Sequence, residues 1–287
     1  MTMPTPAVPS SIRMPPDLHI HTPYSRHAQG TMEEAVRAAV SKGLTEIGFS
    51  DHFPYPEGFV EPAPDCVIPN HREFAQYVNQ TLRLRDAYAG RLTVRLGVEI
   101  DYLPGHMDAI FAQLASYPLD YVIGSIHIVD GVAIDYRPEV LALRLNDLGG
   151  PDGLWTKYWA AMEVFLSDGG FDIVGHLDLP KKFRVAWTRQ RHTESIDRVL
   201  GVIQRRGLAL EINTGGWDRA DGKECYPSED ILRQAIAKGI PVSFGSDAHR
   251  PEDVGRHFTK AADLVRRLGG GGHVTFREGR MERPSGD

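Results

Sequence analysis

Short apolar runs alternate with amphipathic stretches along most of this chain. Met32, Ala35, Val36 and Ala39 show the three- and four-residue spacing of a single helix face, which predicts an amphipathic helix there. The apolar runs, which predict strands, cover residues 17–21, 45–50, 93–100, 119–126, 171–176, 207–213 and 240–246. The amphipathic stretches, which predict helices, cover residues 31–42, 71–89, 105–116, 151–167, 193–206, 228–238 and 252–268.

This alternation predicts an α/β fold in which parallel strands are joined by right-handed crossovers. Seven strand–helix units can close into a barrel, which places its chemistry at the carboxyl ends of the strands. An open, doubly wound sheet would give the same alternation, but it would place a site mainly at one switch point. The position of candidate functional residues can therefore distinguish the two architectures.

Side chains that can bind a metal occur where nearly every apolar run ends. They are His19, His21, His27, His52, Glu99, His127, His176, Asp247 and His249. This distribution over the strand ends favours the closed barrel. Imidazoles with a few carboxylates suit Zn, Mn or Fe ions, and nine ligands exceed what one ion needs. The sequence therefore predicts a metal-dependent hydrolase.

Two of these candidates have specific supporting arguments. His19 and His21 are two residues apart on a strand, so both side chains point to the same face. Glu99 follows the run Thr-Val-Arg-Leu-Gly-Val, where a buried carboxylate is costly unless it is paired or binds a metal. The alternative for Glu99 is a structural salt bridge with Arg95 or a neighbouring basic residue. The remaining histidines are expected on the solvated surface, and they are His71, His106, His192, His257 and His273.

Composition narrows the class of partner. The chain has 287 residues, 41% of them hydrophobic, and a net charge of −6. Its Lys and Arg residues form no basic stripe of the kind that nucleic-acid binding requires. Cys66 and Cys225 are too few for a disulfide framework. The start of the chain lacks the pattern of a signal peptide, and no apolar stretch approaches the ~20 residues of a membrane span. We expect a cytoplasmic protein with a small-molecule substrate and no nucleic-acid or membrane partner; its oligomeric state stays open.

The segments outside the alternating pattern have their own predicted roles. Residues 1–16 contain five prolines and predict a disordered leader, followed by a single domain over residues 17–276. The tail at 277–287 is expected to be flexible, after one short strand at 273–276. The proline-rich segment 53–70 directly follows His52, and we expect it to form a rim or lid over the mouth of the barrel.

The ordered series of ligands resembles the PHP (polymerase and histidinol phosphatase) family over residues 17 to about 260. The resemblance implies a distorted (β/α)7 TIM-like barrel with three divalent metal ions at its carboxyl-terminal mouth. By this resemblance, His19, His21, Glu99 and Asp247 hold the first ion. Glu99 bridges to a second ion held by His127 and His176. The third ion is held by His27, His52 and His249.

Three motifs resemble the histidinol-phosphatase branch of that family. They are Gly-His-Leu-Asp-Leu-Pro-Lys-Lys-Phe at 175–183, Glu-Ile-Asn-Thr-Gly-Gly at 211–216 and Glu-Cys-Tyr-Pro-Ser at 224–228. That branch usually follows its Asn-Thr segment with a Gly-Leu-Arg-type run, whereas this chain has Gly-Trp-Asp-Arg. Arg219 is therefore displaced by one residue from the usual basic position.

Phosphate monoester hydrolysis is very slow without a catalyst, and adjacent cations supply the electrostatic assistance that it needs. We expect a metal-bridging hydroxide as the nucleophile, with Glu99 and Asp247 as catalytic residues. Asp247 or a metal-bound water is expected to protonate the leaving group. Lys181, Lys182 and Arg219 are candidates for phosphate binding, and each could instead be an ordinary surface cation. Asp17 is expected to orient a ligand imidazole.

The leading prediction is hydrolysis of L-histidinol phosphate to L-histidinol and phosphate in histidine biosynthesis. One alternative is a phosphoesterase that acts on nucleotides or other small phosphate esters. A second alternative, a DNA-polymerase-associated module, ranks last because the chain shows no nucleic-acid domain and no basic patch. A metal-binding barrel without catalytic activity is a further alternative, disfavoured because every ligand position is filled. The groups that recognise the imidazole and the amine are not identified by the sequence.

Overall fold

The computed structural model describes residues 14–186, 189–219 and 223–283. Seven parallel strands form one sheet in chain order. They are β1 (Asp17–Ile20), β2 (Glu46–Phe49), β3 (Thr93–Asp101), β4 (Tyr121–Ser125), β7 (Ile173–Val174), β8 (Ala209–Asn213) and β9 (Val242–Gly245). The edges meet where Ile20 bridges Ala248 in parallel register, and the His21 amide donates to the Ala248 carbonyl at 2.9 Å. The sheet is therefore a nearly closed barrel, and the predicted fold class is confirmed.

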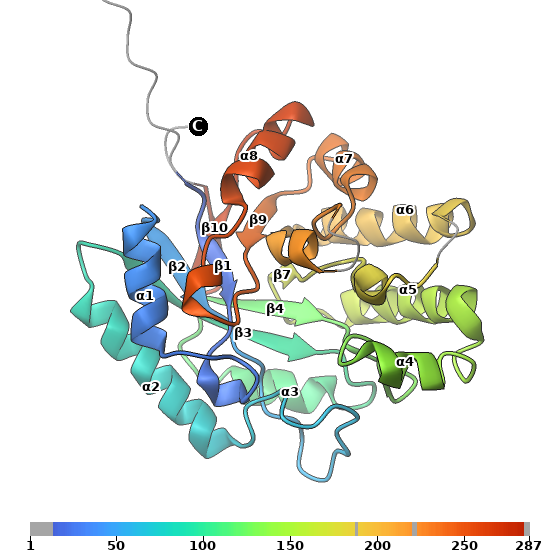
Figure 1. Cartoon of the computed structure of the whole chain (residues 1–287), viewed down its shortest axis with the longest axis horizontal. Coiled ribbons are helices and arrows are strands. Elements are labelled where there is room, and N and C mark those ends of the chain that lie inside the picture. Colours follow the sequence, from blue (N-terminus) through green and yellow to red (C-terminus); the bar gives the residue numbers. More distant parts are fainter. Residues whose placement is uncertain (1–13, 187–188, 220–222, 284–287) are drawn as a thin grey trace, which may run out of the picture.

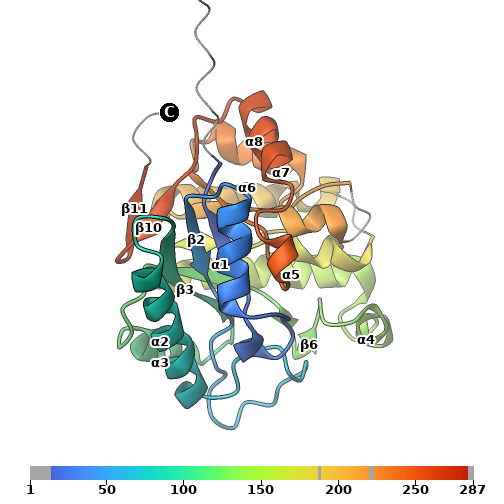
Figure 2. The same ribbon diagram turned by 60° about the vertical axis from the view of Figure 1, so that its left-hand side comes forward.

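Helices surround the strands on their outer face (Figure 1, Figure 2). They are α1 (Met32–Ser41), α2 (His71–Ala87), α3 (Met107–Leu114), α4 (Pro138–Arg144), α5 (Gly150–Asp168), α6 (Arg189–Arg206), α7 (Glu229–Ala237) and α8 (Phe258–Arg267). Short 3-10 turns lie at η1 (Pro23–Ser25), η2 (Leu179–Phe183), η3 (Thr214–Asp218) and η4 (Pro251–Asp253). None of the helices within the described ranges is long and apolar enough to cross a membrane.

The last helix is shorter than the sequence predicts. The expected helix over 252–268 divides into η4 and α8, because His257 takes a left-handed conformation (φ 58°) immediately before α8. The segment between His127 and α5 was also incompletely predicted. It contains a hairpin, β5 (Ile128–Val129) and β6 (Val132–Ala133), followed by α4. The hairpin returns to the barrel mouth, since the Ile134 amide donates to the His127 carbonyl at 2.9 Å.

Tyr121 fills the barrel interior below the candidate site. Its hydroxyl donates to the Leu18 carbonyl at 2.7 Å. A Cβ atom at Gly48 would lie 2.0 Å from the tyrosine oxygen, and one at Gly97 would lie 2.3 Å from its ring. Only glycine at these two positions leaves room for the ring. Because Gly97 and Glu99 share one face of β3, Glu99 lies one layer above this tyrosine, toward the carboxyl end of the strands.

A second hairpin covers the opposite end of the barrel. β10 (Thr275–Arg277) pairs antiparallel with β11 (Arg280–Glu282), so the expectation that the chain frays after one strand is wrong. The Val274 amide donates to Val242, and the Gly279 amide donates to Asp120, each at 2.9 Å. Both acceptors lie at the amino ends of barrel strands. The predicted leader at 1–16 lies, apart from residues 14–16, outside the described residues.

Candidate metal centre

The structure brings all nine predicted ligands to the carboxyl ends of the strands. One cavity of about 210 Å³ is lined by His21, His27, His52, Glu99, His127, His176, Asp247 and His249. His19 lies just behind this lining, fully buried, with its Nε2 3.1 Å from Nε2 of His21. Four residues of the predicted rim segment, Tyr55, Ala63, Cys66 and Val67, form one wall of the same cavity.

Glu99 lies at the centre of this cluster and contacts imidazoles through both oxygens. Its Oε2 is 3.2 Å from Nε2 of His19 and 3.4 Å from Nδ1 of His52. Its Oε1 is 3.0 Å from Nε2 of His176 and 3.6 Å from Nε2 of His127. A carboxylate that presents one oxygen to each of two groups of imidazoles can bridge two cations.

The structure does not pair Glu99 with Arg95. The Arg95 Nε donates to the Glu46 carboxylate at 2.8 Å, and its Nη2 lies 3.8 Å from Glu282. The positive charge of Arg95 is therefore balanced by Glu46 and Glu282 at the amino end of the barrel. The Glu99 Oε1 instead accepts from the Ser125 hydroxyl at 2.6 Å.

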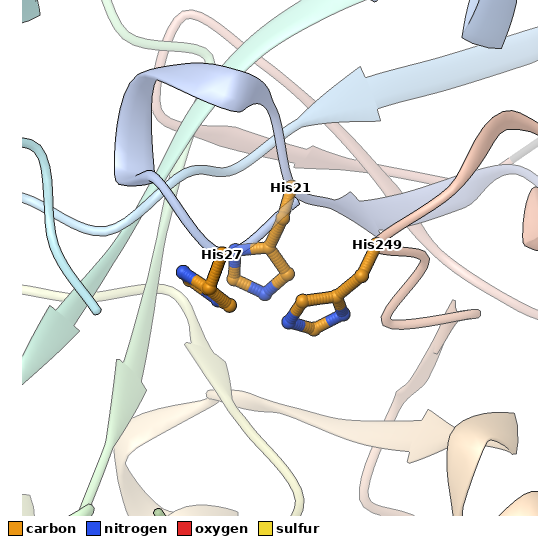
Figure 3. Close-up of side chains that lie close together, drawn as sticks. All are labelled: His21, His27 and His249. Carbon is orange, nitrogen blue, oxygen red and sulfur yellow. The ribbon is translucent and has the colours of Figure 1, made fainter. Parts of the chain in front are cut away.

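Among the described residues, several groups of three side chains present their ligand atoms within 4.8 Å of one another. These groups are His19, His21 and Asp247; Glu99, His127 and His176; His21, His27 and His249; His21, His52 and Glu99; and His52, Asp101 and His127. Figure 3 shows the third of them, in which the loops after β1 and β9 turn three imidazoles toward one another. The groups overlap, which suits a cluster of neighbouring ions more than separate sites.

The donor chemistry of these groups fits metal ions. Nε2 of His127 faces Nε2 of His176 at 3.2 Å, in the same way that His19 faces His21. Two ring nitrogens that face each other can share only one proton, whereas a cation between them would satisfy both lone pairs and the adjacent Glu99 oxygen. Among the described residues, the buried Nδ1 of His52 has no hydrogen-bond partner. A buried polar atom of this kind requires a partner.

The charge states of the metal-free site also suit metal binding. Burial lowers the pKa of His52 to about 3 and lowers the pKa of His27 and His249, so these imidazoles are neutral and can act as ligands. Burial opposes the charge of Glu99, but the imidazole of His19, whose own pKa is raised, and a hydrogen bond with His176 hold the pKa of its carboxyl well below the ordinary range. The centre therefore combines three neutral imidazoles, those of His27, His52 and His249, with the negative charge of Glu99.

The grouping of the candidate ligands differs from the set that the family resemblance implies for the third ion. His27 and His249 lie together, with ring centroids 4.6 Å apart, but they are joined by His21. The ring of His52 stacks on His21 at 4.7 Å and is 5.4 Å from His27. In this structure His52 therefore groups with Glu99, or with His127 and Asp101, and not with His27 and His249.

Carboxylates behind the imidazoles hold them in position, and none of these carboxylates is among the residues predicted from the sequence. Nδ1 of His19 lies 2.6 Å from Oε1 of Glu211, and Nδ1 of His21 lies 3.4 Å from Oδ1 of Asp51. Asp101 contacts Nδ1 of His127. Each contact fixes the ring so that its Nε2 faces the cluster.

Asp17 has a different role from the predicted one. Its buried carboxylate accepts from the Ser246 amide at 2.9 Å and from the Gly255 amide at 2.7 Å. It therefore holds the loop that contains Asp247 and His249 against β1. The expectation that Asp17 orients a ligand imidazole is wrong, because Glu211 occupies that position beside His19.

The three predicted phosphate-binding cations lie in two different environments. Lys182 and Arg219 line the cavity, whereas Lys181 is not part of its lining. The Lys181 Nζ donates to the Cys225 carbonyl at 2.6 Å and pairs with Asp178 at 3.0 Å. The prediction for Lys181 is therefore corrected, since its ammonium ties η2 to the segment before α7.

Arg219 reaches the cavity despite its displaced position in the sequence. Its guanidinium contacts the Asp247 carboxylate and donates to the Asp247 carbonyl at 3.3 Å. Burial opposes the charge of Arg219, but Asp247 raises the pKa of the guanidinium. A permanent cation therefore lies beside the cluster.

One of the histidines expected on the surface is buried. His192 is only 4% exposed, and its ring centroid lies 6.4 Å from that of Trp155. Because α6 packs against α5, His192 in the first turn of α6 is buried, although its polar neighbours in the sequence predict a solvated residue.

A nearly closed parallel barrel with imidazoles and carboxylates at the carboxyl ends of its strands defines a metal-binding α/β-barrel protein. Residues 17–215 match the PHP domain family, and residues 230–268 match the PHP-associated family. A Deinococcus radiodurans protein named "Probable histidinol-phosphatase" is 38% identical over 93% of this chain and 98% of that relative. The chain therefore belongs to the PHP domain family, in its histidinol-phosphatase branch.

Two further similarities agree with this membership. The histidinol-phosphatase of Bacillus subtilis is 29% identical over 83% of this chain and 95% of its own length. The solved structure of the Lactococcus lactis histidinol phosphate phosphatase, a complex with zinc, L-histidinol and phosphate, superimposes with a TM-score of 0.74. That structure covers 94% of this chain and 99% of its own at 21% identity, so it shows the shared fold.

Proposed function

We propose that this protein is a metal-dependent phosphomonoesterase that hydrolyses L-histidinol phosphate to L-histidinol and phosphate in histidine biosynthesis. The central observation is that Glu99 faces two groups of imidazoles in one cavity, with Arg219 and Lys182 in its wall. The D. radiodurans and B. subtilis relatives named histidinol-phosphatase, similar over most of this chain, support the choice of substrate.

We infer that the nine ligands hold three divalent ions, which could be Zn, Mn or Fe. Imidazole and carboxylate donors suit these metals, and the overlapping groups supply enough ligand atoms for a cluster. When bound, ions of this kind would neutralise phosphoryl oxygens and would lower the pKa of water near the phosphate. Glu99 would help to hold such ions, because its two oxygens face two different groups of imidazoles.

The protein's own cations are placed to bind the phosphate. Arg219 is held in place by Asp247, and Lys182 approaches from η2. Both offer charge-assisted hydrogen bonds to a phosphate dianion. Burial opposes the negative charge of Asp247, but Arg219 holds the pKa of its carboxyl well below the ordinary range. Asp247 is therefore ionised in the metal-free site, which favours another group as the donor of the proton to the leaving alkoxide.

The test is phosphate release from a panel of esters by protein loaded with Mn, Zn or Fe. We expect kcat/KM for L-histidinol phosphate to exceed that for para-nitrophenyl phosphate and for a nucleoside monophosphate, because contacts to the organic end can be used in the transition state. A nucleoside monophosphate that equals or exceeds histidinol phosphate would contradict the assigned substrate, although not the phosphatase chemistry.

Metal analysis of the same preparations tests the number of ions. About three equivalents per chain are expected, and removal by a chelator should abolish activity until metal is restored. A fully active preparation with one equivalent or less would contradict the three-ion proposal.

A further inference from the structure

Beyond the ligands and Arg219, the cavity contains a second pair of opposite charges. Asp135 follows the β5–β6 hairpin, which begins directly after His127, and Lys182 lies in η2, which follows His176. Both line the cavity, and the Lys182 Nζ lies 2.9 Å from Oδ2 of Asp135. Their side chains are 20% and 21% exposed, so the pair faces the cavity without being sealed from it.

Asp135 differs in its contacts from the other carboxylates of the cavity. Asp101 contacts His127 and the Tyr55 hydroxyl, and Asp247 contacts Arg219 and His21. These carboxylates are therefore held by rigid rings or by a guanidinium. Asp135 is paired through Oδ2 with the end of a flexible lysine chain, and a carboxylate can accept from several donors at once.

The charge of Asp135 persists in this environment. Burial opposes ionisation, but the adjacent Lys182 ammonium and the imidazole of His127 hold the pKa of the carboxyl well below its ordinary value. Ile128, Ala133 and Tyr136 line the cavity beside it. The wall therefore offers an anion surrounded by apolar and aromatic surface, which suits an organic cation.

We propose that Asp135 binds the ammonium group of the substrate, and that the Asp135–Lys182 pair opens when the substrate binds. This inference rests on the proposed phosphatase function. In a phosphate ester of a 2-amino alcohol, the ammonium is on the carbon next to the ester-bearing carbon, so its two charges are only a few bonds apart and can face the adjacent Asp135 and Lys182 together. The phosphate takes over the Lys182 ammonium, and Asp135 receives the substrate ammonium. The favoured substrates are therefore phosphate monoesters of 2-amino alcohols.

The experiment compares L-histidinol phosphate with its des-amino analogue, 3-(imidazol-4-yl)propyl phosphate. Wild-type protein should prefer the amino ester. Asp135→Asn keeps the shape and removes the charge, so the ratio of the two kcat/KM values should fall by about 10- to 100-fold, as expected for a lost charge-assisted hydrogen bond. Lys182→Met should lower kcat/KM for both esters and change their ratio much less.

Asp130→Asn is the matched control. Asp130 lies in the turn of the same hairpin and also pairs with a lysine, Lys157, but its side chain is exposed and it is not part of the cavity lining. This variant should keep the wild-type ratio. Equal losses for both esters in Asp135→Asn would overturn the proposal, since Asp135 would then act only by holding Lys182.

Inhibition of the wild-type protein gives a second measurement that needs no variant. L-histidinol should inhibit more strongly than 3-(imidazol-4-yl)propanol in the presence of phosphate, and equal inhibition constants would overturn the ammonium site. A different result would contradict the proposed function, namely hydrolysis of other esters but not of L-histidinol phosphate by the wild-type protein. The effect of Asp135→Asn on the amino and des-amino forms of the preferred ester would then still test the site.

Discussion

Glu99 is the residue with the largest expected effect on activity. Glu99→Gln keeps the side-chain shape but removes the charge that faces both groups of imidazoles. We expect kcat to fall by about 10³-fold or more, which is at or beyond the loss seen when one charge-stabilising group is removed from a preorganised site. Bound metal should also decrease. Steady-state kinetics and metal analysis measure both effects, with Glu33→Gln on the exposed face of α1 as a control.

Glu211 acts on the centre through His19. Its Oε1 fixes the His19 ring, and its Oε2 accepts from the His176 amide at 2.7 Å, so it supports two ligands from one position. We expect Glu211→Gln to weaken metal affinity by about 10- to 100-fold, the usual effect of losing a carboxylate behind a ligand imidazole. Competition with a chelator measures this affinity, and Glu229→Gln on α7 is the control. Unchanged affinity would show that Glu211 has only a packing role.

The sequence could indicate that the nine candidate ligands gather at one end of the barrel, because most of them follow apolar runs, but it could not indicate the carboxylates behind them. Asp51 and Glu211 are ordinary acidic residues in the sequence, and only the fold places them behind His21 and His19. Asp101 offered a usable signal. It lies two residues after Glu99 on the same strand, the spacing that identified His19 and His21 as partners on one face.

At the scale of elements, the sequence predicts those strands and helices whose hydrophobic pattern extends over several residues. The barrel strands and most of their helices lie within a few residues of the expected ranges. The two-residue strands β5 and β6 are too short for a period-2 pattern. Residues 280–282 read Arg-Met-Glu, which looks like a polar tail. The pairing of β11 depends on β10, and hence on contacts that are distant in sequence.

Phe276 tests whether the β10–β11 hairpin stabilises the barrel. It is 1% exposed and belongs to the same apolar cluster as Tyr121, Leu18 and Ile173. We expect Phe276→Ala to lower the free energy of unfolding by about 3–5 kcal/mol, because a large buried side chain is removed and a cavity remains. Denaturant unfolding of the metal-loaded protein measures the change. Met281→Ala, at a partly buried neighbour, should cost less, and an equal cost would contradict a specific role for Phe276.

At the scale of the whole molecule, the metal-free centre contains imidazoles with opposing pKa shifts. Burial lowers the pKa of His52 to about 3 from an ordinary value of 6.5. Burial also opposes the charge of His127, but the carboxylates of Asp101 and Asp135 raise its pKa to about 10. The folded state therefore favours a His52 imidazole without a proton and a His127 imidazole with one. Stability of the metal-free protein therefore depends on pH in both directions.

The signs of these shifts predict a stability maximum for the chelated protein near the ordinary histidine pKa. Below about pH 6.5 the unfolded chain binds protons that folded His52, His27 and His249 refuse, so stability falls as the pH decreases toward about 3. Above about pH 6.5 the folded state retains a proton on His127 that the unfolded chain releases, so this contribution is lost as the pH rises toward about 10.

Metal binding should reverse the pH dependence that His127 causes above about pH 6.5. Ligand imidazoles must be deprotonated, so loading the protein with zinc displaces the proton of His127 and is favoured by higher pH. We expect the rise in Tm on zinc binding to grow from about pH 6 to about pH 8, and protons to be released in a weakly buffered solution at neutral pH. Thermal unfolding with and without chelator, together with an indicator dye, measures both quantities. A Tm rise that is independent of pH, without proton release, would show that His127 is already neutral in the metal-free protein or does not bind the metal.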